Sequence, residues 1–283
     1  MSDTLEITKN DIAYLQHDDV PLMLRLRRPP GPGPFPVVVD LHGGAWTKGA
    51  LSECDGRDEV LVRAGLATAA LDFRHADAGY PTSSVDINFA IRWLKAQSGR
   101  LRLDPARVAI TGQSSGGHLA MLAAMRPLEP RYAAIPLPDG TSPHTAHVRC
   151  VGMTWPVINP YSRYRHALRL RGSDAPPAWT ATIPERHDLY WGGEAAMIEG
   201  NPLLALERQE NVETPPALWI QGREDEIHNY RDPDAELDLN EPERFAQRYR
   251  EAGGTIAVHY VDQADRAAAS YGPLVAFFAE HLL

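Results

Sequence analysis

The segment of this sequence best suited to chemistry is Gly-Gln-Ser-Ser-Gly-Gly at residues 112–117. It follows the apolar run 108–111 and opens a helix-forming stretch, so the pattern predicts a strand, a sharp turn and a helix, with Ser114 at the apex. A Cβ at either flanking glycine, Gly112 or Gly116, would collide with neighbouring backbone in such a turn. The spacing favours Ser114 as an exposed nucleophile over an incidental glycine-rich turn.

A second candidate segment is His-Gly-Gly-Ala-Trp at residues 42–46, directly after the apolar run 35–41. Acyl transfer places negative charge on a carbonyl oxygen, and backbone amides of a glycine-rich loop can approach that oxygen closely. In a serine hydrolase of this kind, the amides of Gly44 and Ala45 would be two donors, and the amide of Ser115 would be the third. The alternative is a plain tight turn of a doubly wound fold, which the serine segment downstream disfavours.

Together these segments resemble the α/β-hydrolase fold, and within it the branch of hormone-sensitive lipase and the bacterial carboxylesterases, which carry H-G-G-G and G-x-S-x-G-G. Further similar segments are Leu-Asp-Phe-Arg at 71–74, Trp155-Pro156 and Gly-Arg-Glu-Asp at 222–225, so the resemblance extends over about residues 20–283. The H-G-G-A-W segment is also similar to that of kynurenine formamidases, which carry H-G-G-x-W.

The resemblance implies a serine hydrolase that cleaves a carboxylic ester of a small molecule through an acyl-enzyme intermediate. The alternatives are a formamide or amide hydrolase of the kynurenine formamidase type and a ligand-binding protein of the same fold without catalysis. The expected partner is therefore a small-molecule ester or amide substrate. A homodimer is also compatible with the resemblance, because similar proteins associate through an edge strand or the last helix.

A serine nucleophile needs a base, and the base needs a carboxylate that orients it. The resemblance implies Asp225 as this acid, in the loop after the strand-like run 217–221. The family's histidine follows the last strand, here 255–261, and the aligned residue is Arg266. An arginine side chain stays protonated in proteins, so Arg266 cannot act as the base. It would form an ion pair with Asp225, and its charge would attract an acidic substrate.

The missing base has two interpretations. In the first, the chain is a crippled hydrolase with weak turnover, and Arg266→His would raise its esterase activity. In the second, another histidine substitutes, and the nearby choices are His259 and His228. His259 alternates within a strand and is expected to pack on one sheet face. His228 follows Asp225 by three residues, and we expect it to be awkwardly placed for a bridge to Ser114.

The elements that position these residues alternate between short apolar runs and helical patterns, which favours a mostly parallel sheet with helices on both faces. The expected strands are at 21–27, 36–41, 67–72, 108–111, 148–154, 217–221 and 255–261, and the expected helices are at 52–64, 85–98, 117–125, 242–252 and 271–281. We expect one α/β-hydrolase domain over 1–283. An aromatic-rich insertion at about 156–216 is expected to form a cap over the site, or else to pack only for stability.

Composition limits the partners and the location. The net charge is −9 and lysines and arginines form no block, which argues against nucleic acid and anionic membranes as partners. The two cysteines, Cys54 and Cys150, have no metal-site spacing, and no motif predicts a metal or another cofactor. No stretch has the roughly twenty apolar residues of a membrane span, and the polar N-terminal segment lacks an apolar signal sequence. A cytoplasmic location is therefore expected.

Overall fold

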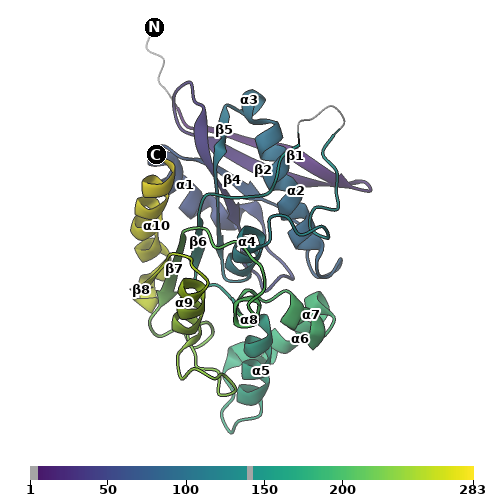
Figure 1. Cartoon of the computed structure of the whole chain (residues 1–283), viewed down its shortest axis with the longest axis vertical. Helices are drawn as coiled ribbons and strands as arrows, with labels where there is room; N and C mark the ends of the chain where they lie inside the picture. Colours follow the sequence, from purple (N-terminus) through teal and green to yellow (C-terminus); the bar gives the residue numbers. More distant parts are fainter. Residues whose placement is uncertain (1–5, 139–142) are drawn as a thin grey trace.

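The computed structural model describes residues 6–138 and 143–283, and its centre is an eight-stranded sheet (Figure 1). The strand order is β1-β2-β4-β3-β5-β6-β7-β8. The strands are β1 (Thr8–His17), β2 (Val20–Arg28), β3 (Phe35–Leu41), β4 (Ala67–Leu71), β5 (Leu103–Gln113), β6 (Val151–Thr154), β7 (Ala217–Gly222) and β8 (Ile256–Val261). β2 runs antiparallel to both of its neighbours, whereas the strands from β4 to β8 in this order are parallel. The carboxyl ends of the parallel strands therefore meet at one edge.

Helices cover both faces of the sheet, because alternate residues of its buried strands point to opposite sides. Val37 and Val39 of β3 belong to one hydrophobic core, and Val38 between them belongs to another. The first core is closed by α2 (Thr82–Ala96), α4 (Ser115–Met125) and α9 (Glu241–Glu251), with the short α3 (Ser98–Leu101) beside α2. The second is closed by α1 (Asp55–Arg63), which follows the short helix η1 (Leu51–Cys54), and by α10 (Arg266–Leu282).

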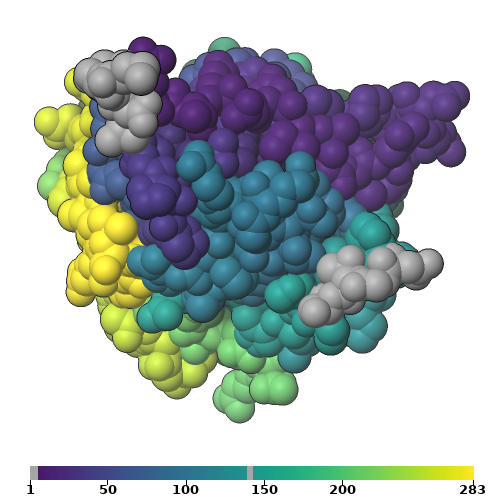
Figure 2. All heavy atoms as spheres, turned by 90° about the horizontal axis from the view of Figure 1, so that it is seen from above, coloured from purple at the N-terminus to yellow at the C-terminus, as the bar shows by residue number. Residues whose placement is uncertain are grey.

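The hairpin of β1 and β2 projects at one side of the molecule, where it is purple in Figure 2. β1 is not among the strands expected from the sequence, whereas all the other strands are. In this edge strand only Tyr14 is fully buried, so its sequence carries little hydrophobic signal. Element ends also differ from expectation: α10 begins at Arg266, five residues earlier than expected, and η3 (Gln263–Asp265) precedes it.

The insertion at 156–216, all of which is described, is helical and contains no strand. Its helices are α5 (Pro160–Arg171), α6 (Ile183–Trp191), α7 (Glu194–Glu199) and α8 (Pro202–Glu207), with a short turn of 3₁₀ helix, η2 (Ala178–Ala181). They lie together below one end of the sheet in Figure 1. Trp46, which follows β3, stacks on Tyr190 and meets Trp191 edge to face, so α6 contacts the segment after β3.

None of the helices in residues 6–138 and 143–283 combines the length and the apolar character needed to cross a membrane.

Candidate active site

Ser114 lies in a strained turn between β5 and α4, as the glycine spacing predicts. Its backbone has φ 53° and ψ −118°, a conformation that costs a non-glycine residue about 1–3 kcal/mol. A Cβ on Gly112 would collide with the carbonyl of Gly116, and a Cβ on Gly116 would collide with the carbonyls of Leu41 and His42. The glycines therefore let the turn pack directly on the end of β3. Ser114 as a residue is half-buried.

His228 contacts Ser114, and Asp225 contacts His228. The Ser114 Oγ lies 3.1 Å from His228 Nε2, and His228 Nδ1 lies 2.8 Å from Asp225 Oδ2. With the imidazole proton on Nδ1, the imidazole donates to the carboxylate and its Nε2 accepts from the serine hydroxyl. These three side chains form the hydrogen-bonded chain in which a histidine takes a proton from serine.

The expectation that His228 is awkwardly placed for Ser114 is wrong. After β7 the chain makes a tight turn, in which the Asp225 carbonyl accepts from the amides of His228 at 3.1 Å and Asn229 at 2.7 Å. Residues three apart lie on the same side of such a turn. The signal was therefore present in the spacing Asp225-x-x-His228. His259, the other candidate, is exposed on the edge strand β8.

The electrostatics keep His228 neutral and Asp225 charged. Burial lowers the pKa of His228, and the charges of Arg163 and Arg266 lower it further. The hydrogen bond and the charge of Asp225 raise this pKa, but the net value lies below that of an ordinary histidine. Burial alone would raise the pKa of Asp225. The hydrogen bond from His228, the charges of His228 and Arg266, and the Ile227 amide outweigh it, so the pKa of this carboxyl is lowered. A neutral imidazole beside a carboxylate is the state required of a general base.

Arg266 forms an ion pair with Asp225, the acid expected from the resemblance. Its Nη1 donates to Asp225 Oδ2 at 2.5 Å, so the expected ion pair is confirmed. Its guanidinium also lies 4.4 Å from the ring centre of Trp155, which follows β6. Asp225 Oδ2 therefore accepts from both His228 and Arg266. Arg266, at the position where the family has its histidine, contacts the Asp225 carboxylate from the segment after β8. His228 contacts the same carboxylate from the loop after β7.

The segment after β3 lies against the serine turn. A Cβ added to Gly43 would be 3.5 Å from the Ser114 Cβ. Gly44 and Ala45 have positive φ values, 110° and 52°. Within the described residues, the amides of Gly44, Ala45 and Ser115 donate no hydrogen bond to another protein group. All three predicted oxyanion donors are therefore available for a ligand oxygen.

Two buried histidines brace this segment. His42 Nδ1 lies 2.8 Å from the Gly43 carbonyl, and the Trp46 indole donates to His118 Nδ1 at 3.3 Å. His118 Nε2 lies 2.8 Å from the Gly200 carbonyl, between α7 and α8. Burial lowers the pKa of each histidine to about 4, although a hydrogen bond to a carbonyl opposes the shift. Both are therefore neutral near pH 7, and the contacts from Trp46 through His118 to Gly200 tie the segment to the inserted helices.

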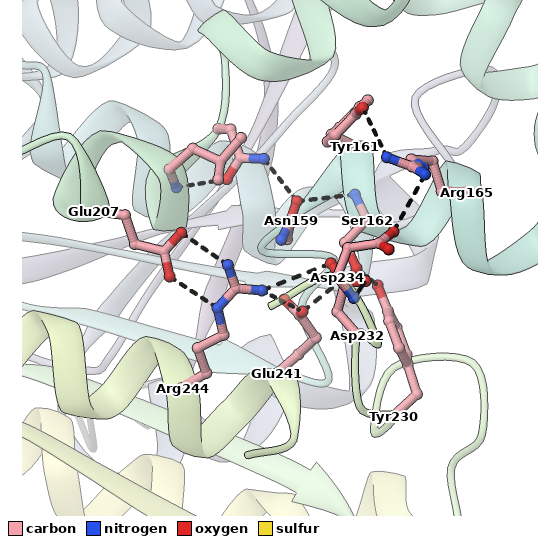
Figure 3. Close-up of polar contacts among 12 residues, drawn as sticks. Asn159, Tyr161, Ser162, Arg165, Glu207, Tyr230, Asp232, Asp234, Glu241 and Arg244 are labelled. Carbon is pink, nitrogen blue, oxygen red and sulfur yellow. Dashed lines mark hydrogen bonds and ion pairs between the residues drawn. The ribbon is translucent and has the colours of Figure 1, made fainter. Parts of the chain in front are cut away.

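Polar contacts fix the loop that carries Asp225 and His228 (Figure 3). The Tyr230 hydroxyl lies 3.3 Å from Ser162 Oγ on α5. Arg244 of α9 donates to Glu241 at 3.3 Å and lies 3.7 Å from Asp232 of the loop. Its other nitrogens bind Glu207 of α8 at 2.8 and 2.7 Å. The loop is thus held between the inserted helices and α9, which limits the freedom of His228.

Several solved structures with a similar fold are esterases. Carboxyl esterase 2 from the mycorrhizal fungus Tuber melanosporum matches with a TM-score of 0.73 at 19% identity, over 98% of this chain and 88% of that one. A fungal esterase from Rhizomucor miehei gives 0.74 at 20% identity, over 98% and 84%. The chain has the α/β-hydrolase fold. The fold class expected from the sequence is therefore confirmed.

Sequence comparisons connect this α/β-hydrolase with ester hydrolases. The family model BD-FAE matches residues 27–134, which contain Gly44, Ala45 and Ser114 but not Asp225 or His228. A probable carboxylic ester hydrolase of Mycobacterium tuberculosis, LipM, is 36% identical over 102 residues, 35% of this chain and 24% of the relative. An ethyl acetate hydrolase of Pseudomonas putida is 34% identical over 132 residues, 45% and 42% of the two chains. The resemblance to carboxylesterases is confirmed, and these matches span less than half of each relative.

Proposed function

We propose that this α/β-hydrolase is a carboxylic ester hydrolase in which Ser114 is the nucleophile, His228 the general base and Asp225 the acid that orients it. The observation that carries the proposal is the continuous chain from Ser114 Oγ to His228 at 3.1 Å and from His228 to Asp225 at 2.8 Å. The hydrolases named among the relatives also act on esters, which favours an ester over a formamide substrate.

In the acylation step, the Ser114 oxygen attacks the ester carbonyl carbon while its proton passes to His228 Nε2. The negative charge that develops on the carbonyl oxygen is stabilised by the amides of Gly44, Ala45 and Ser115. The carbon–oxygen bond to the alcohol then breaks, and the alcohol leaves with the proton from His228. Asp225 remains ionised throughout and stabilises the imidazolium.

In the deacylation step, His228 takes a proton from water, and the resulting hydroxide oxygen bonds to the acyl carbon. The bond to Ser114 breaks, the carboxylic acid leaves, and the serine oxygen regains its proton from His228. In this scheme Arg266 does not replace the base. It anchors Asp225, so we propose an active hydrolase in place of a crippled one.

The test combines a labelling reagent with an ester substrate. We expect a fluorophosphonate to add to Ser114 and inactivate hydrolysis of p-nitrophenyl butyrate, with Ser114→Ala losing both reactions. The matched control is Ser52→Ala, which changes an exposed serine and should leave both unchanged.

The same samples separate the alternatives. A folded wild-type chain that neither takes the label nor cleaves any ester would contradict the proposal and favour the ligand-binding alternative. Faster cleavage of N-formylkynurenine than of esters would favour the formamide hydrolase. A homodimer, a cytoplasmic location and a cap role for 156–216 stay predictions from the sequence.

A further inference from the structure

Arg57 of α1 is a buried cation that binds the strand before the proposed oxyanion segment. Its residue is 4% exposed, and Asp40 of β3 is fully buried. Arg57 Nη2 donates to Asp40 Oδ1 at 2.6 Å, and Arg57 Nε donates to Asp40 Oδ2 at 3.0 Å. Asp58, the neighbouring buried carboxylate on α1, is bound by Arg27 of β2. The two parallel hydrogen bonds to Asp40 fix both the position and the orientation of the Arg57 guanidinium.

The remaining nitrogen of Arg57 reaches the residue before Ser114. Arg57 Nη1 donates to Gln113 Oε1 at 2.8 Å. β3 and β5 are parallel neighbours, and Asp40 is in register with Thr111, two residues before Gln113. One guanidinium therefore connects the carboxyl ends of the two strands that carry the proposed oxyanion segment and the proposed nucleophile. Burial would lower the pKa of Arg57, but opposing effects led by the charge of Asp40 raise it, so the side chain stays charged.

Gln113 in turn lies against the oxyanion segment. A Cβ added to Gly43 would be 3.3 Å from the Gln113 carbonyl oxygen and 3.8 Å from Gln113 Nε2. Gly43 directly precedes Gly44, and Gln113 directly precedes Ser114. A movement of Gln113 would therefore change the placement of the nucleophile relative to the proposed oxyanion donors.

The backbone of Ser114 needs restraint from its surroundings. A non-glycine residue with φ 53° and ψ −118° keeps this conformation only where neighbouring groups over-determine it. The close packing of Gly112 and Gly116 restrains the turn through the main chain. The hydrogen bond from Arg57 to Gln113 adds a restraint through a side chain. An ion pair that served only to fix α1 on the sheet would be complete with Asp40.

We propose that Arg57 is a positioning residue of the proposed active site: through its hydrogen bond to Gln113, it keeps the turn of Ser114 aligned with the oxyanion donors. The inference rests on the proposed function and adds a residue that touches neither the substrate nor the reacting atoms. Arginine suits this role because its rigid fork serves a carboxylate with two nitrogens and an amide oxygen with the third. A lysine ammonium on a flexible chain cannot hold both partners in this geometry.

The experiment removes this link from each side and measures hydrolysis of p-nitrophenyl butyrate. Gln113→Met replaces the acceptor by an adaptable side chain of similar length and leaves the pair of Arg57 with Asp40 intact. Arg57→Lys keeps the buried charge but lacks the fork. We expect each variant to lower kcat by about 10-fold to 100-fold with KM within about twofold, because the alignment acts in the transition state. Fluorophosphonate labelling of Ser114 should slow by a similar factor.

The double variant separates positioning from a general loss of stability. If both substitutions break the same link, Gln113→Met combined with Arg57→Lys should lower kcat about as much as the worse single variant, whereas independent effects would multiply. The matched controls are Gln16→Met, at an exposed glutamine of β1, and Arg63→Lys, at an exposed arginine of α1. Both controls should leave kcat unchanged.

The outcomes distinguish this inference from the proposed function. Folded Gln113→Met, judged by circular dichroism, that keeps kcat within about twofold of the wild type would overturn the positioning role, even if its melting temperature falls. Losses that multiply in the double variant would overturn it as well. If Arg57→Lys does not fold, the comparison of Gln113→Met with the wild type decides alone. A wild-type chain without ester cleavage and without fluorophosphonate labelling would instead overturn the proposed function.

Discussion

Replacing His228 by glutamine tests the proposed base directly. Glutamine keeps much of the buried volume but cannot take a proton from Ser114 near pH 7. Because a positioned base contributes about 10²–10⁴-fold to such reactions, we expect kcat/KM for p-nitrophenyl butyrate to fall by about 10³-fold. Labelling of Ser114 by a fluorophosphonate should slow in parallel, since the same proton transfer activates the nucleophile.

The variant should still fold, because Asp225 keeps its other partners. Arg266 remains 2.5 Å from this carboxylate, and the Ile227 amide remains 3.2 Å from it. The loss is then about one charge-assisted hydrogen bond, about 1.5–3 kcal/mol, against a typical stability of about 5–15 kcal/mol. Far-ultraviolet circular dichroism and urea unfolding should therefore show a native but less stable protein.

The matched control is His259→Gln, which changes an exposed histidine on the edge strand β8 and should leave the rate unchanged. The reasoning is refuted if folded His228→Gln keeps more than about a tenth of the wild-type kcat/KM, or if His259→Gln produces the larger loss. In either case the contact between Ser114 and His228 would not be the catalytic one.

The remaining predictions concern Arg266, pH and the serine turn. Arg266→His should give no gain in esterase activity, contrary to the expectation from the sequence. His228 already contacts Ser114, and the substitution removes the 2.5 Å hydrogen bond to Asp225. A tenfold gain in p-nitrophenyl butyrate hydrolysis would count against His228 as the base. Arg266→Gln should move the acid limb of the kcat/KM profile to higher pH, because the arginine charge lowers the pKa of His228 and its removal raises that pKa; an unchanged limb would contradict this coupling. The melting temperature should fall as the pH drops from about 6.5 towards 4. In this window the histidines bind protons in the unfolded chain but not in the folded protein, where burial lowers the pKa values of His42, His118, His187 and His228. A melting temperature independent of pH in this window would show that these histidines titrate normally. Gly116→Ala should lower both the melting temperature and the activity, because its Cβ would meet the backbone of Leu41 and His42, whereas Gly99→Ala meets open space and serves as the control; equal melting temperatures of the two variants would argue against the close packing.

The sequence by itself determined the features that depend on local pattern. The alternation of apolar runs and helical stretches predicted the parallel sheet, since each buried strand carries its own hydrophobic signal. The turn at Ser114 was predictable because glycines on both sides of a serine, between a strand and a helix, are required by the backbone itself. The ion pair between Arg266 and Asp225 was expected from the resemblance, which implies Asp225 as the acid and places Arg266 at the position of the family's histidine.

Tertiary structure decided which histidine reaches Ser114. His228 and Asp225 are brought together by a local turn, but their contact with the serine depends on how the loop after β7 packs between α5 and α9. Sequence spacing does not fix that packing, and the family pattern pointed to position 266. The edge strand β1 was missed because it buries little apolar surface. The sequence also could not show that, among residues 6–138 and 143–283, the Nε and Nη1 atoms of the buried Arg163 have no hydrogen-bond partner, because the neighbours of a side chain are known only from the tertiary structure.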